Sequence, residues 1–368
     1  MSETTTDEIE MPAITGRVLD DANAGRSADA SDLVERRNLY RIGAFLTVVG
    51  VVAIGIGLAP LLVIGVRTVL FVVGPVALYM GMRRLGLARF GADFDLTFVL
   101  SCVWLAALIA AALFAPLLPL AEHEDTTKTL AAESYAEPNL FSSNPLGTNN
   151  FGLDLLARSV YGARSSLIVA VAAVLIGMVI GGAIGIVAGY FGGKVDRIIG
   201  VMTNSLLAVP ALILLIALAS VLEPNLRNIA LALAILAIPS MVRIARANTL
   251  VYSQREFVLA ARSMGATKLR VMLREIAPNV ALPLASLGMV MISVMIVAEA
   301  SLSFLGLGIQ PPSPTWGNMI SEGQGNVFEQ YPYVVLVPGF FLFLTVFSFN
   351  MVGEKAQRKT GGTREVKL

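Results

Sequence analysis

The chain has 368 residues, of which 56% are hydrophobic and 14% are charged, and its mean hydropathy is +0.74. One soluble core of this length would not hide so much apolar surface, so the composition predicts an integral membrane protein and excludes a soluble enzyme. The apolar runs are continuous rather than alternating, which excludes a membrane barrel. The formal net charge of +1 indicates no particular partner, and a single cysteine, Cys102, excludes a disulfide framework or a cysteine-based metal motif.

The first 42 residues are acidic and rich in Ser and Ala, which predicts a disordered cytoplasmic tail rather than a cleaved signal. Apolar runs of roughly 18 to 25 residues follow, and each is long enough to cross a bilayer as a helix. The first two runs are expected to form a hairpin, 43–82, and residues 354–368 a second cytoplasmic tail. The predicted fold class is therefore an all-α polytopic membrane protein. We expect its spans over 43–60, 61–82, 96–120, 165–190, 199–222, 228–244, 280–304 and 332–353.

Lys and Arg residues indicate the orientation of these helices. With the N-terminus inside, 22 of the 27 basic residues fall in cytoplasmic segments, and the reverse orientation would place the basic loops outside. We therefore expect a multi-pass protein of the cytoplasmic (inner) membrane, in contact with membrane lipid and with both termini cytoplasmic. Any multi-span protein shows this bias, so the charges indicate direction and not function.

Two long segments are expected on the outer side, 121–164 and 305–331. The first is predicted to end in a short interfacial helix that leads into the fourth span, with Asp154 paired to Arg158 at an i,i+4 spacing. The second contains three prolines between 311 and 314, which predicts a rigid extended segment with Trp316 at the outer interface.

The sequence contains no phosphate-cradling GxxxxGK[ST] loop, so we expect no ATP hydrolysis by this chain alone. His123 is the single histidine and lies in an acidic outer loop, where a solvated surface side chain is the preferred interpretation over a metal ligand or general base. No other residues converge on a catalytic or metal site. We expect no catalytic residue, no metal, no cofactor bound by this chain and no nucleic-acid partner.

Glycine and proline residues indicate where the predicted membrane helices pack closely and where they are expected to kink. Gly181, Gly185 and Gly189 recur every four residues in the fourth run and give one bare face, for which tight packing against another helix is the preferred interpretation. Prolines interrupt four later runs, at 210, 239, 283 and 338. A kink at such a residue would suit a moving gate, although membrane helices tolerate proline in general.

Three charged or amide side chains lie inside the later apolar runs: Asn204, Glu299 and Asn350. We take Glu299 and Asn204 as candidates for a translocation path, because an ionisable group inside a membrane is a functional candidate by default. The alternative for Glu299 is structural, since it lies in the outer third of its span, where water or the segment around Trp316 would satisfy it.

The inner loop between the sixth and seventh runs reads SQREFVLAARSMGATKLRVMLREIAPNVALPL. Its composition predicts two short helices, the first capped by Ser253 and separated from the second by Gly265. Two amphipathic helices that project into the cytoplasm suit docking of a soluble partner. A basic loop that lies against the inner lipid headgroups fits equally well. The apolar stripe expected on the first helix comprises Phe257, Ala260, Ala261 and Met264.

This loop resembles the EAA motif of permease subunits of binding-protein-dependent ABC importers, in which Glu-Ala-Ala is followed after three residues by Gly and later by Ile and Pro. The resemblance extends over 144–353, where NPLGTNNFGLDLLARSVYGARSSL, AGYFGGKVDR and AEASLSFLGLGIQPPSPTWGNM are similar to the C-type permease of the peptide/nickel (dipeptide/oligopeptide) branch. Three positions depart from the pattern: Leu259 stands for the motif's glutamate, and Asn149 and Leu153 replace the Asp and Arg of GTDxxGRD. The residues at the motif positions are Ala260, Ala261, Gly265, Ile276 and Pro278, and the nearest acidic residue is Glu256, one turn before Leu259.

The resemblance implies a type I ABC importer transmembrane fold with a six-span core over 96–353 and an accessory hairpin over 43–82. It implies that the chain forms half of a translocation pathway for peptides or related small solutes and that its cytoplasmic loop, 254–278, couples it to ATPases. The implied partners are a homologous second permease, two ABC ATPase subunits that use ATP and Mg, and an extracytoplasmic solute-binding protein.

The rival interpretation is a self-sufficient secondary transporter or channel. It would need ion-coupling carboxylates near the bilayer midplane and no docking loop, and the sequence shows roughly the reverse. A membrane-embedded enzyme is a more distant alternative, because no catalytic cluster is apparent.

Overall fold

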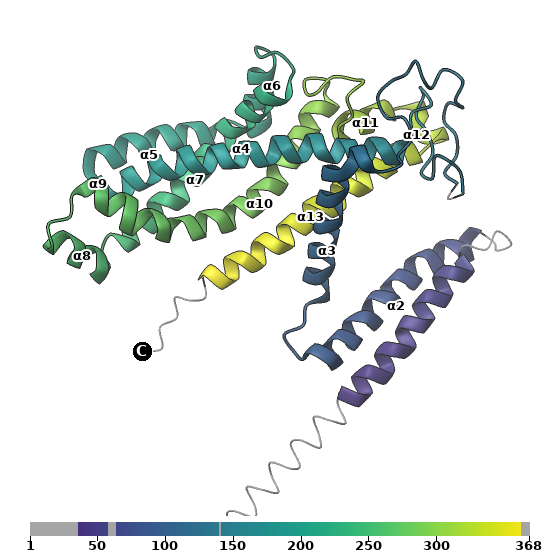
Figure 1. Ribbon diagram of the computed structural model, residues 1–368, viewed down its shortest axis with the longest axis horizontal. Coiled ribbons are helices and arrows are strands. Elements are labelled where there is room, and N and C mark those ends of the chain that lie inside the picture. The colour runs from purple at the N-terminus through teal and green to yellow at the C-terminus, as the bar shows by residue number, and fades with distance from the viewer. Residues whose placement is uncertain (1–35, 58–63, 140, 362–368) are drawn as a thin grey trace, which may run out of the picture. The chain divides into compact units, whose positions relative to one another are not determined.

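The computed structural model describes residues 36–57, 64–139 and 141–361 (Figure 1). The chain divides into two compact units, Met1–Val99 and Leu100–Leu368. The described residues of both units form helices and no β-strand, with one isolated bridge between Thr148 and Asp154. The predicted all-α fold class is therefore confirmed.

The first unit contains helix Arg36–Gly57 and α2 (Ile64–Phe90), which cover most of the ranges expected for the first two spans. The turn expected near residue 60 lies outside the described residues. A Cβ on Gly50 would lie 2.5 Å from the backbone nitrogen of Leu78, and a Cβ on Gly81 would lie 2.5 Å from that of Thr47. The absence of a side chain at these two glycines thus lets the two helices approach closely.

Six helices within the described residues are long and apolar enough to cross a membrane, counting Arg36–Gly57. The remaining five agree with the spans expected from the third, fourth, sixth, seventh and eighth apolar runs. The helices from α3 onward are α3 (Leu96–Phe114), η1 (Ala115–Leu117), α4 (Leu155–Phe191), α5 (Gly193–Ala208), α6 (Ala211–Ala219), α7 (Leu226–Tyr252), α8 (Glu256–Ser263), α9 (Lys268–Arg270), η2 (Val271–Ile276), α10 (Ala277–Phe304), α11 (Trp316–Glu322), α12 (Asn326–Gln330) and α13 (Tyr333–Gly361).

The expected fifth span, 199–222, is not one helix. It consists of α5 and α6, which are bent by 86° at the break between them. Pro210 explains the position of the break, because the residue before a proline is driven out of the helical region and Val209 is extended. The prediction of a continuous span was therefore wrong, while the proline signal within it marked the bend.

The glycine face of α4 packs against α7, as the sequence predicted. A Cβ on Gly181 would lie 2.7 Å from the carbonyl oxygen of Ile238, and one on Gly185 would lie 2.6 Å from both the Val242 carbonyl oxygen and the Ala245 Cβ. Real Cβ atoms essentially never show such distances. Helices α4 and α7 thus meet backbone to backbone, which only glycine permits.

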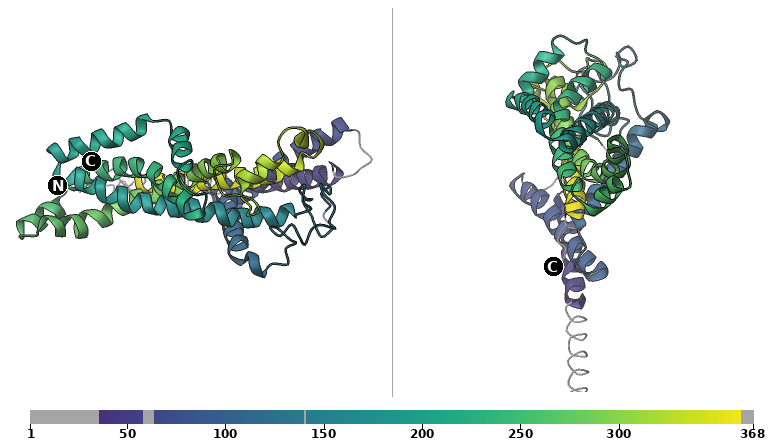
Figure 2. Two further views of the ribbon diagram at one scale, coloured as in Figure 1. Left: turned by 90° about the horizontal axis from the view of Figure 1, so that it is seen from above. Right: turned by 90° about the vertical axis from the view of Figure 1, so that its left-hand side faces the viewer.

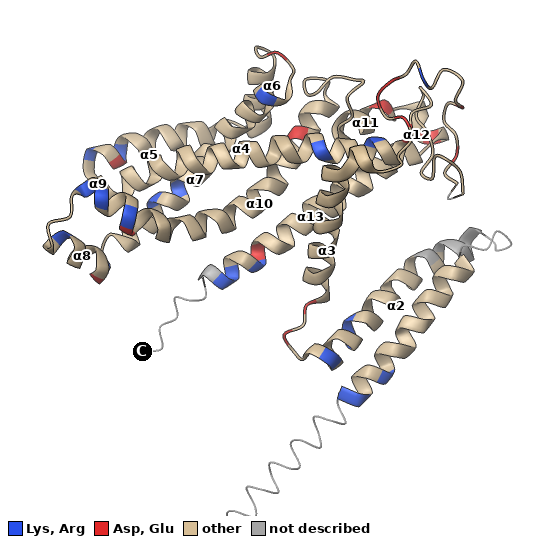
Figure 3. Ribbon diagram, viewed as in Figure 1, with Lys and Arg blue, Asp and Glu red and all other residues tan. Residues whose placement is uncertain are grey.

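The two ends of the second unit differ in charge. Figure 1 and the left view of Figure 2 show α8 and α9 at one end and α11 and α12 at the other. Lys and Arg gather at the end formed by α8, α9 and the start of α5, and Asp and Glu gather in the loops around α11 and α12 (Figure 3). This separation agrees with a basic cytoplasmic end and an acidic outer end.

Candidate functional site

The inner loop folds as two helical pieces around Gly265. The first is α8, and the second begins with α9 and continues through the π-helical segment η2 into α10. Gly265 adopts φ +81°, in the left-handed region that side chains disfavour. The predicted helix break at this glycine is confirmed. The predicted cap is wrong, since Arg255 precedes α8 without a side-chain cap and Ser253 instead ends α7.

One face of the loop is anchored to the transmembrane helices. Val258, Val271 and the motif residue Ile276 are fully buried, and the motif residue Ala261 is buried as well. These four side chains belong to the main core cluster of the second unit. Burial of apolar side chains contributes about 1.5–3 kcal/mol for each large one, so this face holds the loop in place.

Two basic side chains strengthen that attachment. The Arg262 guanidinium lies 4.9 Å from the centre of the Tyr190 ring, and the Lys268 ammonium lies 5.6 Å from that of Phe191. Both aromatic residues end α4. These cations thus contact rings at the end of a membrane helix, which weakens the alternative in which the loop's basic residues serve to bind lipid headgroups.

The opposite face of the loop exposes large apolar side chains. We call this surface the apolar tip; its residues are between 39% and 82% exposed. The motif residues Ala260, Gly265 and Pro278 and the nearby acid Glu256 are also exposed. The expected stripe is therefore divided, because Ala261 faces inward while its three partners face outward. The apolar tip comprises Phe257, Leu259, Met264, Leu269 and Leu273.

At the acidic end, a buried ion pair joins the two outer segments. The Arg158 Nη2 lies 2.6 Å from Glu322 Oε1, and the Asn149 amide donates to Glu322 Oε2 at 3.0 Å. Asp154 does not pair with Arg158 as predicted. It lies just before α4, where its carboxylate accepts the Ala157 N–H at 2.7 Å as an N-cap. The separate interfacial helix is also absent from the described residues, because α4 begins at Leu155 and continues through the whole span.

Trp316 reinforces this junction. Its ring is fully buried, and its indole N–H donates to the Ser159 carbonyl at 3.0 Å. Trp316 does not belong to an extended segment as predicted, since it begins α11 behind the N-cap Thr315. Glu322 was not recognised from the sequence, because its partner Arg158 is 164 positions away and no local spacing links them.

His123 is not a freely solvated side chain either. Its ring stacks on Tyr161 with 3.6 Å between ring centres, and burial lowers its pKa despite the attraction of Glu122. The hydrogen bond from the Asp125 amide, together with the Lys128 ammonium, lowers the pKa of Glu122 to about 2. Within the described residues no group of three or more His, Cys, Asp and Glu side chains would hold a metal ion.

Glu299 lies between α4 and α10 rather than in an open path. It is fully buried, and its two carboxylate oxygens accept hydrogen bonds from Ser166 and Ser303, each at 2.7 Å. The hydroxyls of Ser166 and Ser303, rather than Trp316, satisfy it, and this geometry fits the structural alternative. Asn204 is exposed on α5. The structure does not bring these two candidates together.

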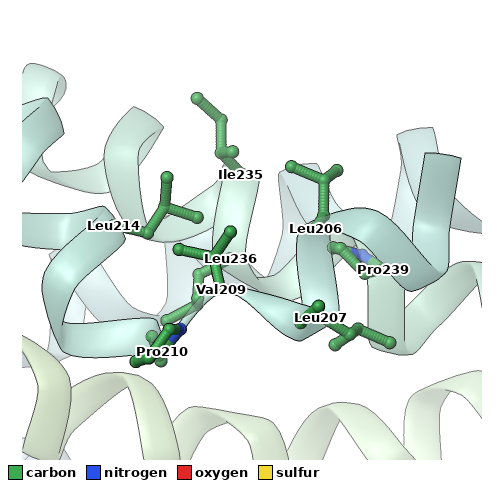
Figure 4. A pocket seen from close by; sticks show the side chains of 10 residues that line it. Leu206, Leu207, Val209, Pro210, Leu214, Ile235, Leu236 and Pro239 are labelled. Atoms are coloured by element: carbon green, nitrogen blue, oxygen red, sulfur yellow. The ribbon is translucent and has the colours of Figure 1, made fainter.

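Two cavities lie beside the bend between α5 and α6. One has a volume of about 250 Å³ and is lined by apolar residues around Val209 and Pro210, as Figure 4 shows. The other, of about 390 Å³, lies among α6, α7, α10 and α13. Its polar lining residues are Ser293, Ser301 and Asn350. Of these three, only Asn350 stood out in the sequence, since serines within an apolar run carry no distinguishing signal.

Comparisons with known proteins give consistent matches. The family described as binding-protein-dependent transport system inner membrane component matches residues 181–360. Over 228 residues the chain is 37% identical to the glutathione transport system permease protein GsiD of Pectobacterium atrosepticum, covering 61% of this chain and 75% of that protein. Over 256 residues it is 34% identical to the dipeptide transport system permease protein DppC of Alkalihalophilus pseudofirmus, covering 70% and 82%. An inward facing structure of the MetNI methionine ABC transporter matches with a TM-score of 0.45 and 19% identity, over 56% of this chain and 96% of that chain.

Proposed function

The chain belongs to the family of binding-protein-dependent transport system inner membrane components, as a permease subunit of a peptide-type ABC importer, and we propose that it receives the work of ATP hydrolysis at its apolar tip. The observation that carries this proposal is the two-sided loop. One face is anchored in the core, and the other presents exposed apolar side chains around a left-handed glycine. A rigidly held loop that exposes apolar side chains at its end is typical of a surface that binds a partner protein rather than one that stays in contact with water.

The proposed assembly contains a homologous second permease, two ATPase subunits that use ATP and Mg, and an extracytoplasmic solute-binding protein. The chain forms half of the pathway, and dipeptides or glutathione-like peptides are the proposed solutes, because similar permeases carry those names. Movement of the ATPases is transmitted through 254–278 to α10, since η2 continues into that helix without a loop. Alternating access then follows from rocking of the packed helices.

The proposed orientation places the apolar tip and both termini in the cytoplasm, and the segment 121–154 outside. In a Cys102→Ser background, Leu130→Cys should react with an impermeant thiol reagent in intact cells, whereas Met264→Cys should react only after lysis. These positions suit the test because their side chains are 85% and 82% exposed. Reaction of Met264→Cys but not Leu130→Cys in intact cells would reverse the orientation.

The docking proposal is tested by Met264→Asp, at the most exposed side chain of the apolar tip. A charge in an apolar contact must be desolvated, so co-purification of the ATPase should fall by about tenfold, equivalent to about 1.4 kcal/mol of binding energy. Leu130→Asp is the control, since it changes an exposed apolar side chain at the other end of the unit. Equal ATPase recovery from both variants would argue against docking at the apolar tip.

A further inference from the structure

The cavity of about 390 Å³ among α6, α7, α10 and α13 has a specific polar character. Eleven residues line it, and none of them is charged. Ser293, Val297 and Ser301 follow one another at intervals of four residues, so they form one face of α10. Asn350 of α13 faces the same space. Glu299 is absent from this lining and contacts Ser166 on α4 instead.

The polar groups of the cavity present hydrogen-bond acceptors. The Ser293 hydroxyl donates to the Val290 carbonyl at 2.6 Å, and the Ser301 hydroxyl donates to the Val297 carbonyl at 2.8 Å. Both hydroxyl protons are thus used within α10, while the oxygens keep lone pairs. The Asn350 side chain donates one of its two amide N–H groups to the Val346 carbonyl at 3.1 Å, and its side-chain oxygen is an acceptor. Such a lining suits a solute that brings N–H donors.

The dimensions of the cavity agree with a short peptide. Eight residues separate Ser293 from Ser301, which places them roughly 12 Å apart along the helix at 1.5 Å per residue. An extended peptide advances about 3.3–3.6 Å per residue, so this distance corresponds to three or four residues. The volume lies at the lower end of the range of roughly 300–1,000 Å³ for small-molecule sites.

We infer that this cavity contacts the transported solute, and that Ser293, Ser301 and Asn350 accept hydrogen bonds from peptide N–H groups without selecting for side-chain charge. This inference rests on the proposed function. It also assigns the translocation path to the face of α10 that carries the serines rather than to the face that carries Glu299. A neutral lining lets acidic, basic and neutral peptides pass alike, because no fixed charge opposes any of them.

The test introduces a charge and measures selectivity. The importer is reconstituted in vesicles with its partner subunits, and initial uptake of alanyl-lysine, alanyl-glutamate and alanyl-alanine is measured with one solute-binding protein. Ser301→Asp should raise the ratio of alanyl-lysine to alanyl-glutamate uptake by about tenfold, because a fixed carboxylate attracts one and repels the other at short range. Ser301→Asn is the neutral control of similar size and should leave the ratio unchanged.

The ratio of alanyl-lysine to alanyl-glutamate uptake is measured on one vesicle preparation, so it does not depend on the amount of folded importer in that preparation. Asn350→Asp, on a different helix, should shift the ratio in the same direction, and Ser220→Asp, which lies outside the cavity, should not. If wild-type importer carries the dipeptides but neither cavity variant changes the ratio, the cavity assignment is overturned and the proposed function stands. A wild-type importer that hydrolyses ATP yet carries none of the three dipeptides would contradict the solute class on which both statements rest.

Discussion

Gly265→Val is expected to abolish most solute uptake while leaving the amount of membrane-inserted protein unchanged. No atom lies within 4 Å of a Cβ placed on Gly265, so the variant meets no steric clash with neighbours. The variant is instead strained in its backbone, because φ is +81° at this position and a β-branched residue in that conformation costs about 1–3 kcal/mol of free energy. The loop relieves this strain by changing the angle between α8 and α9, which misplaces the apolar tip. We expect uptake to fall by about tenfold or more, since 1.4 kcal/mol corresponds to a factor of ten.

Two controls separate this effect from general damage. Gly265→Asn should retain uptake within about twofold, because asparagine adopts the left-handed conformation more readily than other side chains. Gly306→Val creates the same kind of backbone strain at the outer end, where φ is +77° and no atom lies within 4 Å. ATPase recovery should be normal in Gly306→Val and reduced in Gly265→Val. Wild-type uptake by Gly265→Val would contradict the coupling role of the loop.

Gly185→Val is expected to have the second large effect, on folding rather than on coupling. Its Cβ would meet the Val242 carbonyl oxygen and the Ala245 Cβ at 2.6 Å, and the Arg246 nitrogen at 2.9 Å. Backbone atoms of α7 cannot move aside as a flexible side chain would. Overpacking commonly costs about 1–3 kcal/mol, and this contact is closer than most, so we expect a large loss of folded protein.

The matched control for this variant is Gly200→Val on α5, where no atom lies within 4 Å of the added Cβ. The measurement is the thermal midpoint of the detergent-solubilised protein together with its abundance in the membrane. Gly185→Val should lower both, and Gly200→Val should lower neither by a comparable amount. Equal thermal midpoints for the two variants would show that the stability of the protein does not depend on close backbone contact between α4 and α7.

The helices were predictable because bilayer thickness fixes the length of an apolar run, whatever its neighbours. The glycine face of α4 was predictable for a similar reason, since Gly181 and Gly185 carry a spacing that only close packing uses. Pro210 predicted a kink at this position. The angle of 86° between α5 and α6, however, depends on how α6 packs against α7 and α10. Local sequence carries no such information.

The site was predictable only in part. Gly265 could be identified because a helix break and a left-handed turn favour glycine locally. Which apolar side chains form the exposed tip depends on the end of α4, which covers one face of the loop through Tyr190 and Phe191. The pairing of Arg158 with Glu322 joins segments 164 positions apart. The i,i+4 spacing favoured Asp154 as the partner of Arg158, and that prediction was wrong. Long-range partners of this kind require the fold.

Contact between the apolar tip and the ATPase is best tested by site-specific crosslinking. A photoreactive side chain is placed at Met264 or, as the outer control, at Leu130, both of which are highly exposed. The intact importer is irradiated in its native membrane, and the adducts are identified by mass. We expect an adduct with the ATPase from position 264 and none from position 130. Adducts with lipid alone at 264, in membranes that contain the ATPase, would contradict this expectation.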